Sequence, residues 1–465
     1  MFIDGVWYAV IARNLAEGNG SFWFPQFSST IFSSFHEHPG FVFWLQAFFF
    51  KILGDSFWTE RIFSGTQYLI TGRLIFLIWK KIFPQSHPFR NYWFLPILFW
   101  QFNVVTYLYQ PGNLLDTPVS IFCLLAVYFC LKENQEKKKG YLVLAGLATC
   151  LGILSKGLVA LFPLATIGCF WLILSRRNFV REMLLKTMIV FGTVIVFFLV
   201  LFLAVPDAWA STQIYLDVQV LASLTGARRL YYYQDNRFFI IGQLAFTLSP
   251  MILGWMTLII IRKISRSTTP LAADSHQKLA WVCLLVGVTA SFPLMISPRQ
   301  ALPYLIPSLP YFAIGFGMLA ASYFDFFIQH ILNKTNWLRR TLEMGSLSVI
   351  ILGIGLVITG FQKSNQRDAS TIHDALLIGE QVGTHQVISS SVYDMYISGY
   401  LMRYQSVSID TSDLNRDYLM TTEPMNTLGT SYQQVPIDTK KYFLYQKKST
   451  DQFSDFLKIE YNETY

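Results

Sequence analysis

Residues 187–205 read TMIVFGTVIVFFLVLFLAV and contain no charged side chain. A helix needs roughly 17–25 apolar residues to cross a hydrocarbon core of about 30 Å, and slightly fewer inside a helical bundle. This run therefore predicts a transmembrane helix. Comparable runs predict further spans over 61–79, 92–110, 117–131, 141–155, 158–174, 238–261, 279–297, 301–323 and 342–361. The fold class expected is an α-helical polytopic membrane protein with about ten spans.

The composition of the chain agrees with a membrane location. Of its 465 residues, 53% are hydrophobic and 14% are charged, whereas soluble domains average roughly 25% charged residues. The net charge of +8 does not indicate a nucleic-acid partner, because the basic residues lie in short loops between apolar segments. The five cysteines lie inside apolar runs, as small buried hydrophobic residues do: Cys123, Cys130, Cys150, Cys169 and Cys283.

Lysine and arginine are concentrated in every second loop, for example at Lys80 and Lys81, at 137–139 and at Arg176 and Arg177. Cytoplasmic loops carry an excess of these residues. The alternate loops are therefore predicted to face outward, namely 1–60, 111–116, 155–157, 206–237, 298–300 and everything after 362.

Residues 1–60 are predicted to form a first outer loop that carries the active-site side of the protein. DGVWYAVIARNLAEG, over 4–18, has helical spacing, and 41–53 is apolar but short enough to be interfacial or re-entrant. Neither a span nor a signal peptide precedes this outward region. We therefore expect a first transmembrane span to be missing from the N-terminus, unless a later internal signal translocates the region.

The region after the predicted bundle (61–361) is predicted to be a small soluble α/β domain on the outer side, over 362–465. Its pattern favours helices over 367–380 and 393–404. Strands are favoured at QVISSS, YLMTT and KKYFLYQ.

Two aspartates at the outer ends of helices are candidate catalytic groups. Asp4 opens the first outer helix, and Asp116 lies in QPGNLLDTP just outside the third span. Each could cap a helix or complement its dipole, and Pro118 favours that alternative for Asp116. Each could instead be a carboxylate in an interfacial cavity, available as a general base.

Candidate cations lie at two further outer edges. Lys156, in LGILSKGLVALFP, could extend to the membrane interface or bind an anionic lipid headgroup. Arg299 and Tyr304 lie in SPRQALPYLIPSLP, whose prolines predict a helix broken beside protein or a cavity. Arg228 and Arg229 are interpreted as surface residues of the long outer loop.

The segment SFHEHPG, residues 34–40, places Glu37 between His36 and His38. Glu37 and His38, with Asp116, leave open a divalent metal site, although so few local ligands rarely complete one. Together the outer residues provide carboxylates, which can deprotonate a nucleophile, and cations, which can hold a departing phosphate. A sugar carried on a lipid phosphate needs both.

Five stretches resemble the C-type-fold (GT-C) membrane glycosyltransferases that include the protein O-mannosyltransferases and the aminoarabinose (lipid A) transferases. They are DGVWYAVIARNLAEG, FHEHPGFVFWLQAFFFKILGDSFWTERIFSG, NLLDTPVSIF, LGILSKGLVALFP and SPRQALPYLIPSLPYFAI, and they occur in the family's order. The resemblance implies an inverting hexosyl- or pentosyltransferase, which takes its sugar from a polyprenyl phosphate. The acceptor would be an envelope lipid, glycan or protein outside the membrane.

The resemblance also implies roles for single residues. Asp4 matches the family's catalytic base or acceptor-positioning acid, and Glu37 and Asp116 match its two later acids. Lys156 matches a lysine expected beside the donor's phosphate or lipid, and Arg299 and Tyr304 fall in the last motif.

Three positions depart from the family's pattern. Gly5 stands where an acid usually follows the first aspartate, which bears mainly on the acceptor. His38 replaces a lysine with a group that titrates near pH 6.5 when unperturbed. Arg299 stands where lysine is common and adds a planar fork for phosphate.

Two other classes of protein remain open. A transporter or lipid flippase would explain several spans with charged residues in the membrane, but it predicts repeated halves with broken helices near the midplane. A membrane-anchored sensor would explain the outer domain but not the ordered motifs. The preferred hypothesis is a glycosyltransferase of a bacterial inner membrane that uses an undecaprenyl-phosphate sugar.

Overall fold

The computed structural model describes residues 2–174, 180–225, 234–265, 276–332, 367–426 and 431–448, with 337, 340, 341 and 344. The predicted span over 342–361 lies outside the described residues, apart from residue 344. The chain divides into two compact units. One contains Met1–Ser21, Pro25–Phe35 and Ile354–Tyr465, and the other contains Phe22–Phe24 and His36–Gly353. This division cuts across the expected boundary at residue 60.

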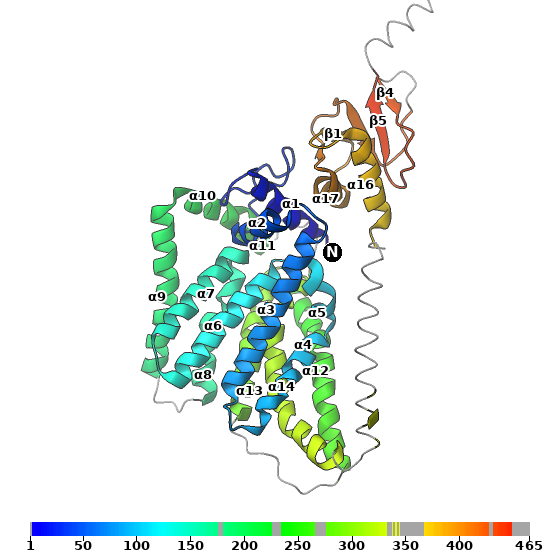
Figure 1. Ribbon diagram of the computed structural model, residues 1–465. Coiled ribbons are helices and arrows are strands. Elements are labelled where there is room, and N and C mark those ends of the chain that lie inside the picture. The colour runs from blue at the N-terminus through cyan, green and yellow to red at the C-terminus, as the bar shows by residue number, and fades with distance from the viewer. Residues whose placement is uncertain are drawn as a thin grey trace, which may run out of the picture. The chain divides into compact units, whose positions relative to one another are not determined.

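The larger unit is a bundle of helices (Figure 1). Its longer helices are α3 (Thr59–Ile82), α6 (Asp116–Glu136), α7 (Gly140–Lys156), α9 (Val180–Ala204), α12 (Phe239–Ile264), α13 (Gln277–Ser291) and α14 (Leu309–Phe327). Helix α6 packs against α3 and α7, and α14 packs against α12 and α13. Helix α14 has apolar residues on all of its faces, and it is buried over most of its length.

Among the described residues, five helices are long and apolar enough to cross a membrane: α3, α9, α12, Gln277–Ile296 and Leu309–His330. A sixth span is possible if Val104–Gly112 and α6, which meet at 110°, count as one. Three shorter apolar helices are Phe41–Leu53 (α2), α7 and Leu158–Leu174. In the described part of the chain, fewer spans therefore pass by length and composition than the nine predicted there, because several apolar runs are divided.

The division of 92–110 and 158–174 has local causes. The first run becomes η1 (Pro88–Tyr92), α4 (Phe94–Gln101) and α5 (Val104–Tyr109), and Asn103 caps α5 by accepting from the amide of Thr106. The second begins as the 3₁₀ helix η3 (Leu158–Ala165), which contains Pro163, before α8 (Thr166–Leu174). A proline and an N-cap each interrupt the α-helical hydrogen bonds.

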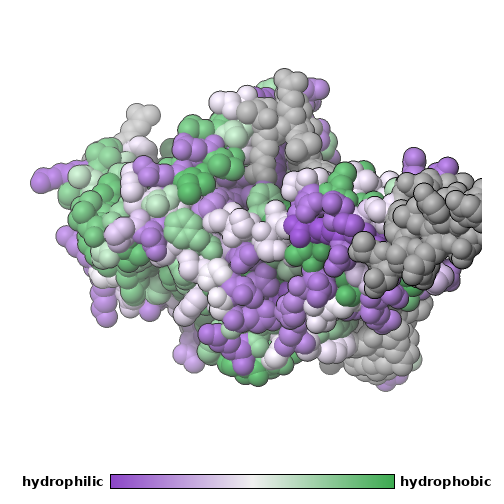
Figure 2. Space-filling model, turned by 90° about the horizontal axis from the view of Figure 1, so that it is seen from above, coloured by the Kyte–Doolittle hydropathy of each residue, from purple (hydrophilic) through white to green (hydrophobic). Residues whose placement is uncertain are grey.

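The surface of the bundle differs between its side and its end. Helix α9 exposes large apolar side chains, including Met188, Val196, Leu199 and Leu203, as expected of a helix that faces lipid. The end at which α2 and α10 (Pro206–Tyr215) lie is seen from above in Figure 2, and there hydrophilic residues are interspersed with hydrophobic ones. That mixture is typical of a surface in contact with water.

The smaller unit contains a five-stranded sheet of order β2-β1-β3-β5-β4. Strands β1 (Val387–Ser390), β2 (Ser408–Asp410) and β3 (Tyr418–Thr421) are parallel, and β4 (Tyr432–Gln434) and β5 (Phe443–Lys447) are antiparallel to their neighbours. Helices α16 (Ala369–Val382) and α17 (Met395–Gln405) pack against each other. The small C-terminal α/β domain is thus confirmed.

Helix α1 (Ile3–Glu17) belongs to this smaller unit and packs against α17. The Trp7 indole donates to the carbonyl of Met395 at 3.0 Å, and the Arg13 guanidinium donates to the carbonyl of Arg403 at 3.2 Å. The helix ends at Gly18, whose φ of 89° favours glycine. The predicted helix is confirmed, and its burial on nearly every side explains why most of its residues between Ile3 and Ala12 are apolar.

Candidate active site

Lys156 and Asp116 form an ion pair in the larger unit. Asp116 is the first residue of α6, Lys156 is the last residue of α7, and the distance from Nζ to Oδ2 is 2.5 Å. Both side chains are nearly buried, at 11% and 6% exposure. The N-cap of α6 is Leu115, and no side chain caps the helix. The prediction that Asp116 is an N-cap is therefore wrong. A nearly dry ion pair at the ends of two helices fixes both charged groups in one place.

Tyr304 contacts the same lysine through its aromatic face. The Lys156 ammonium lies 4.7 Å from the centroid of the Tyr304 ring, within the range of a cation–π interaction. Tyr304 is held in the 3₁₀ helix η8 (Leu302–Leu305), and α14 begins four residues further on with Pro310 in its first turn. The predicted break of the helix at these prolines is confirmed.

Arg299 lies in a loop that is fixed to the start of α12. The neighbouring Gln300 donates to the carbonyl of Arg237 at 2.9 Å and accepts from the amide of Ile240 at 2.8 Å. The amide of Arg299 donates to the Ser297 hydroxyl at 3.1 Å. These contacts hold the backbone from which the guanidinium extends.

These residues line a cavity of about 750 Å³. Its lining includes the polar or charged side chains of His38, Asp116, Lys156, Arg299 and Tyr304. Two side chains with a permanent positive charge and one imidazole thus share a cavity with a single carboxylate among its lining residues. These cations suit the cavity to an anionic group.

Most of the other lining residues are apolar. They come mainly from η3, from η7 (Phe292–Ile296) and from the segment 216–225, and they include Leu158, Val159, Phe162, Val220, Leu224, Phe292 and Ile296. Most of these side chains are also exposed on the surface of the bundle. The cavity therefore combines cationic side chains with apolar ones that reach the outside, as an anionic lipid requires.

The structure does not bring every predicted residue into this cavity. Glu37 is half-buried but is not among the lining residues, and His36 packs its ring edge-to-face against Phe24. Burial lowers the pKa of His36, which favours its neutral form. Asp4 lies in the first turn of α1, in the other unit. Arg228 and Arg229 lie outside the described residues.

A metal site does not assemble from the predicted ligands. Within the described ranges, no group of three or more histidine, cysteine, aspartate or glutamate side chains is placed to hold an ion. Asp116 is instead engaged with Lys156. Glu37, His38 and Asp116 therefore do not fit a shared metal.

Sequence reasoning missed the residues that α10 and the helical turns after it supply. Tyr215, Gln219 and Ser223 all line the cavity. They are spaced four residues apart, as on one face of a helix. That spacing was the available signal, but nothing local indicated which side of the segment faces the cavity.

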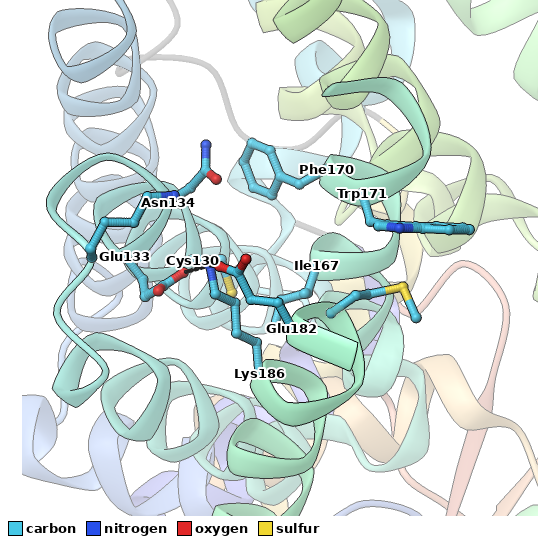
Figure 3. Close-up of a pocket in the computed structure, with 10 residues that line it drawn as sticks. Cys130, Glu133, Asn134, Ile167, Phe170, Trp171, Glu182 and Lys186 are labelled. Atoms are coloured by element: carbon cyan, nitrogen blue, oxygen red, sulfur yellow. Dashed lines mark ion pairs between the residues drawn. The ribbon is translucent and has the colours of Figure 1, made fainter. Parts of the chain in front are cut away.

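A second, smaller cavity of about 340 Å³ lies among the ends of α6 and α8 and the start of α9 (Figure 3). Lys186 extends between two carboxylates there, at 2.9 Å from Glu133 and 2.8 Å from Glu182. Glu133 is buried whereas Glu182 is half-exposed. The lysine offsets one of the two negative charges and joins α9 to α6, which indicates a structural role.

Replacing Lys186 with methionine should lower the thermal unfolding midpoint in detergent by roughly 5 °C or more. The substitution leaves the buried Glu133 carboxylate without its counter-ion, which is costly. Glu182→Gln, which removes only the exposed partner, should change the midpoint by about 2 °C at most. Equal midpoints for the two variants would mean that the buried pair does not stabilise the bundle.

Residues 37–206 match the model of the family described as dolichyl-phosphate-mannose-protein mannosyltransferase. The fold is similar to that of ArnT from Cupriavidus metallidurans bound to undecaprenyl phosphate, with a TM-score of 0.65, 12% identity and coverage of 96% of this chain and 94% of that one. For the apo state of ArnT the TM-score is 0.59, with 13% identity and coverage of 95% and 92%. None of the curated proteins is a significant match.

The chain is thus a membrane protein of the C-type (GT-C) glycosyltransferase fold, similar to the mannosyltransferases and to ArnT. This confirms the resemblance that the ordered motifs predicted. The matched family region contains Glu37, His38, Asp116 and Lys156, whereas Asp4, Arg299 and Tyr304 lie outside it.

Proposed function

We propose that the protein is an integral-membrane glycosyltransferase that takes a sugar from a polyprenyl-phosphate donor, in particular undecaprenyl phosphate. The observation that carries this proposal is one cavity lined by the cations Lys156 and Arg299, by His38 and by many apolar side chains, several of them exposed. A polyprenyl phosphate has an anionic head and an apolar chain. The similarity of the fold to ArnT, whose structure binds undecaprenyl phosphate, supports it.

The proposed chemistry combines the charges of the cavity residues with the resemblance to the family's motifs. By that resemblance, Asp4 accepts the proton of the acceptor hydroxyl or orients it, and the acceptor oxygen attacks the anomeric carbon. The bond from that carbon to the phosphate oxygen breaks, with inversion, and polyprenyl phosphate departs. Lys156, Arg299 and His38 stabilise the negative charge that develops on the phosphate.

Asp116 has a supporting part in this scheme. Its carboxylate is occupied by the Lys156 ammonium at 2.5 Å, so it is poorly placed to remove a proton from an acceptor. It orients the ammonium that binds the donor. Glu37 remains a second acid near the site by its resemblance to the family's motif.

The alternating distribution of lysine and arginine supports an orientation in which the site and the C-terminal domain lie outside the cytoplasm. The membrane would be a bacterial inner membrane. The acceptor would then be an envelope lipid, glycan or protein.

The proposal is tested with membranes that contain the protein and polyprenyl-phosphate sugars that are radiolabelled in the sugar. Label should leave the lipid-phosphate fraction and enter a lipid, glycan or protein fraction, which identifies the acceptor class. Membranes without the protein are the control. If the wild-type protein consumes no lipid-linked sugar from a panel of hexose and pentose donors, the enzyme is not of this kind.

His38 should make donor binding depend on pH. Its imidazole lines the cavity with Lys156, Arg299 and Asp116, and only its protonated form attracts phosphate. Binding should therefore be strongest at low pH and weaken as pH rises through the imidazole range, near 6.5 for an unperturbed group. His38→Lys should flatten the profile between about pH 5.5 and 8, as measured by the donor KM. A variant profile like that of the wild type would remove His38 from the phosphate site.

A further inference from the structure

Helix α10 continues through a π-helical turn, η5 (Leu216–Leu221), into α11 (Ala222–Thr225). This segment contributes one wall of the large cavity. Tyr215, at the end of α10, contacts the main chain of Lys156.

The Tyr215 hydroxyl donates a hydrogen bond to the main-chain carbonyl of Lys156, at 3.3 Å. Lys156 is the last residue of α7, and the final carbonyls of a helix have no partner within it. Tyr215 is 9% exposed, and burial raises its pKa to about 12. The phenol is therefore neutral and able to donate throughout the physiological pH range.

Gly157, directly after Lys156, is shaped to receive this side chain. Its φ of 95° and ψ of −151° belong to a region that residues other than glycine rarely adopt. A Cβ atom added there would overlap the Tyr215 hydroxyl and lie 2.5 Å from the ring carbon that carries it. The tyrosine thus occupies the space that a side chain at residue 157 would fill.

The side chain of the same lysine reaches Asp116 and Tyr304. Its backbone is held by Tyr215 and its ammonium by Asp116. Since the ammonium is the proposed phosphate ligand, the backbone contact sets where that charge lies in the cavity.

We propose that Tyr215 is a positioning residue of the donor site, acting through the main chain of Lys156 in the space that Gly157 leaves open. The inference rests on the proposed function, because it names Lys156 as the residue being positioned. The alternative is that Tyr215 only anchors α10 to the bundle. In that case its loss would lower stability without changing donor affinity at temperatures where the protein is folded.

The test is the affinity of purified protein for undecaprenyl phosphate, measured beside the thermal unfolding midpoint without ligand. Tyr215→Phe keeps the ring and removes the hydrogen bond. It should raise the Kd roughly three- to tenfold while the midpoint changes by about 2 °C at most. Tyr311→Phe is the matched control, because the buried Tyr311 hydroxyl has no hydrogen-bond partner among the described residues, and its Kd should be unchanged.

A second pair of variants tests the contact with residue 157. Gly157→Ala should raise the Kd by at least about tenfold, and by clearly less when Tyr215→Ala has already removed the ring. Equal effects of Gly157→Ala in both backgrounds would overturn the proposed contact. An unchanged Kd in Tyr215→Phe, with normal wild-type binding, would overturn the positioning role alone. Absence of wild-type binding would overturn the donor assignment together with it.

Discussion

Replacing Lys156 with methionine is expected to lower the rate of sugar transfer by about 10²–10³-fold. The substitution keeps most of the side-chain volume and removes the ammonium that contacts Asp116 and the face of Tyr304. It thus removes a cation from the cavity and leaves a carboxylate there without its counter-ion. The measurement is the initial rate of transfer from a labelled donor at matched amounts of membrane protein.

A suitable control is Lys81→Met, which removes another paired lysine. Lys81 lies 2.6 Å from Glu136 and does not line the large cavity. Its loss should leave the rate within about twofold of wild type, because a partly exposed ion pair contributes little. If Lys156→Met retains more than about a tenth of the wild-type rate, the ammonium is not a principal ligand of the leaving phosphate.

Much of the fold could be predicted from the sequence because its signals are local. Uninterrupted apolar runs such as 187–205 predict α9, and the stop at Gly18 predicts the end of α1. Three of the five strands follow from short patterns of β-branched and aromatic residues. Strands β2 and β4 were missed because each has only three residues, too few for a period to be visible.

The interruptions within apolar runs were harder to predict. Hydropathy measures how apolar a run is, but it does not reveal where the chain changes from α-helix to 3₁₀ helix, as it does at η3. The association of α1 with α17 is also hidden in the sequence, because Trp7 and Met395 are 388 residues apart. Such long-range packing depends on the whole fold.

In the candidate site, too, single residues could be predicted from the sequence, but their contacts with distant residues could not. Its charged residues could be selected one by one, because lysine and arginine are scarce in outer loops. The pairing of Asp116 with Lys156, however, joins residues 40 positions apart, and it changes the interpretation of the aspartate from base or cap to partner of a cation. The spacing of Tyr215, Gln219 and Ser223 indicated a shared helical face but not the contact of Tyr215 with Lys156, since that contact depends on the space beside Gly157.

Asp4→Asn is expected to abolish transfer, with a fall of at least about 10³-fold, if Asp4 is the general base. The amide has the same shape as the carboxylate but cannot take up a proton. The fold should survive, because Asp4 is half-buried in the first turn of α1 and the packing of this helix relies on Trp7 and Arg13. Transfer is measured as for Lys156, and retention of the fold is checked by the unfolding midpoint.

Loss of a negative charge from the start of a helix is itself slightly destabilising. The comparison therefore needs a control variant that loses only a first-turn carboxylate and no proposed catalytic group. Asp207→Asn provides it, because Asp207 is an exposed residue in the first turn of α10 and does not line the cavity. Its transfer rate should stay within about twofold of wild type. A folded Asp4→Asn protein that still transfers sugar at a similar rate would show that the proton leaves through another group. Glu37 would then be the acid to replace next.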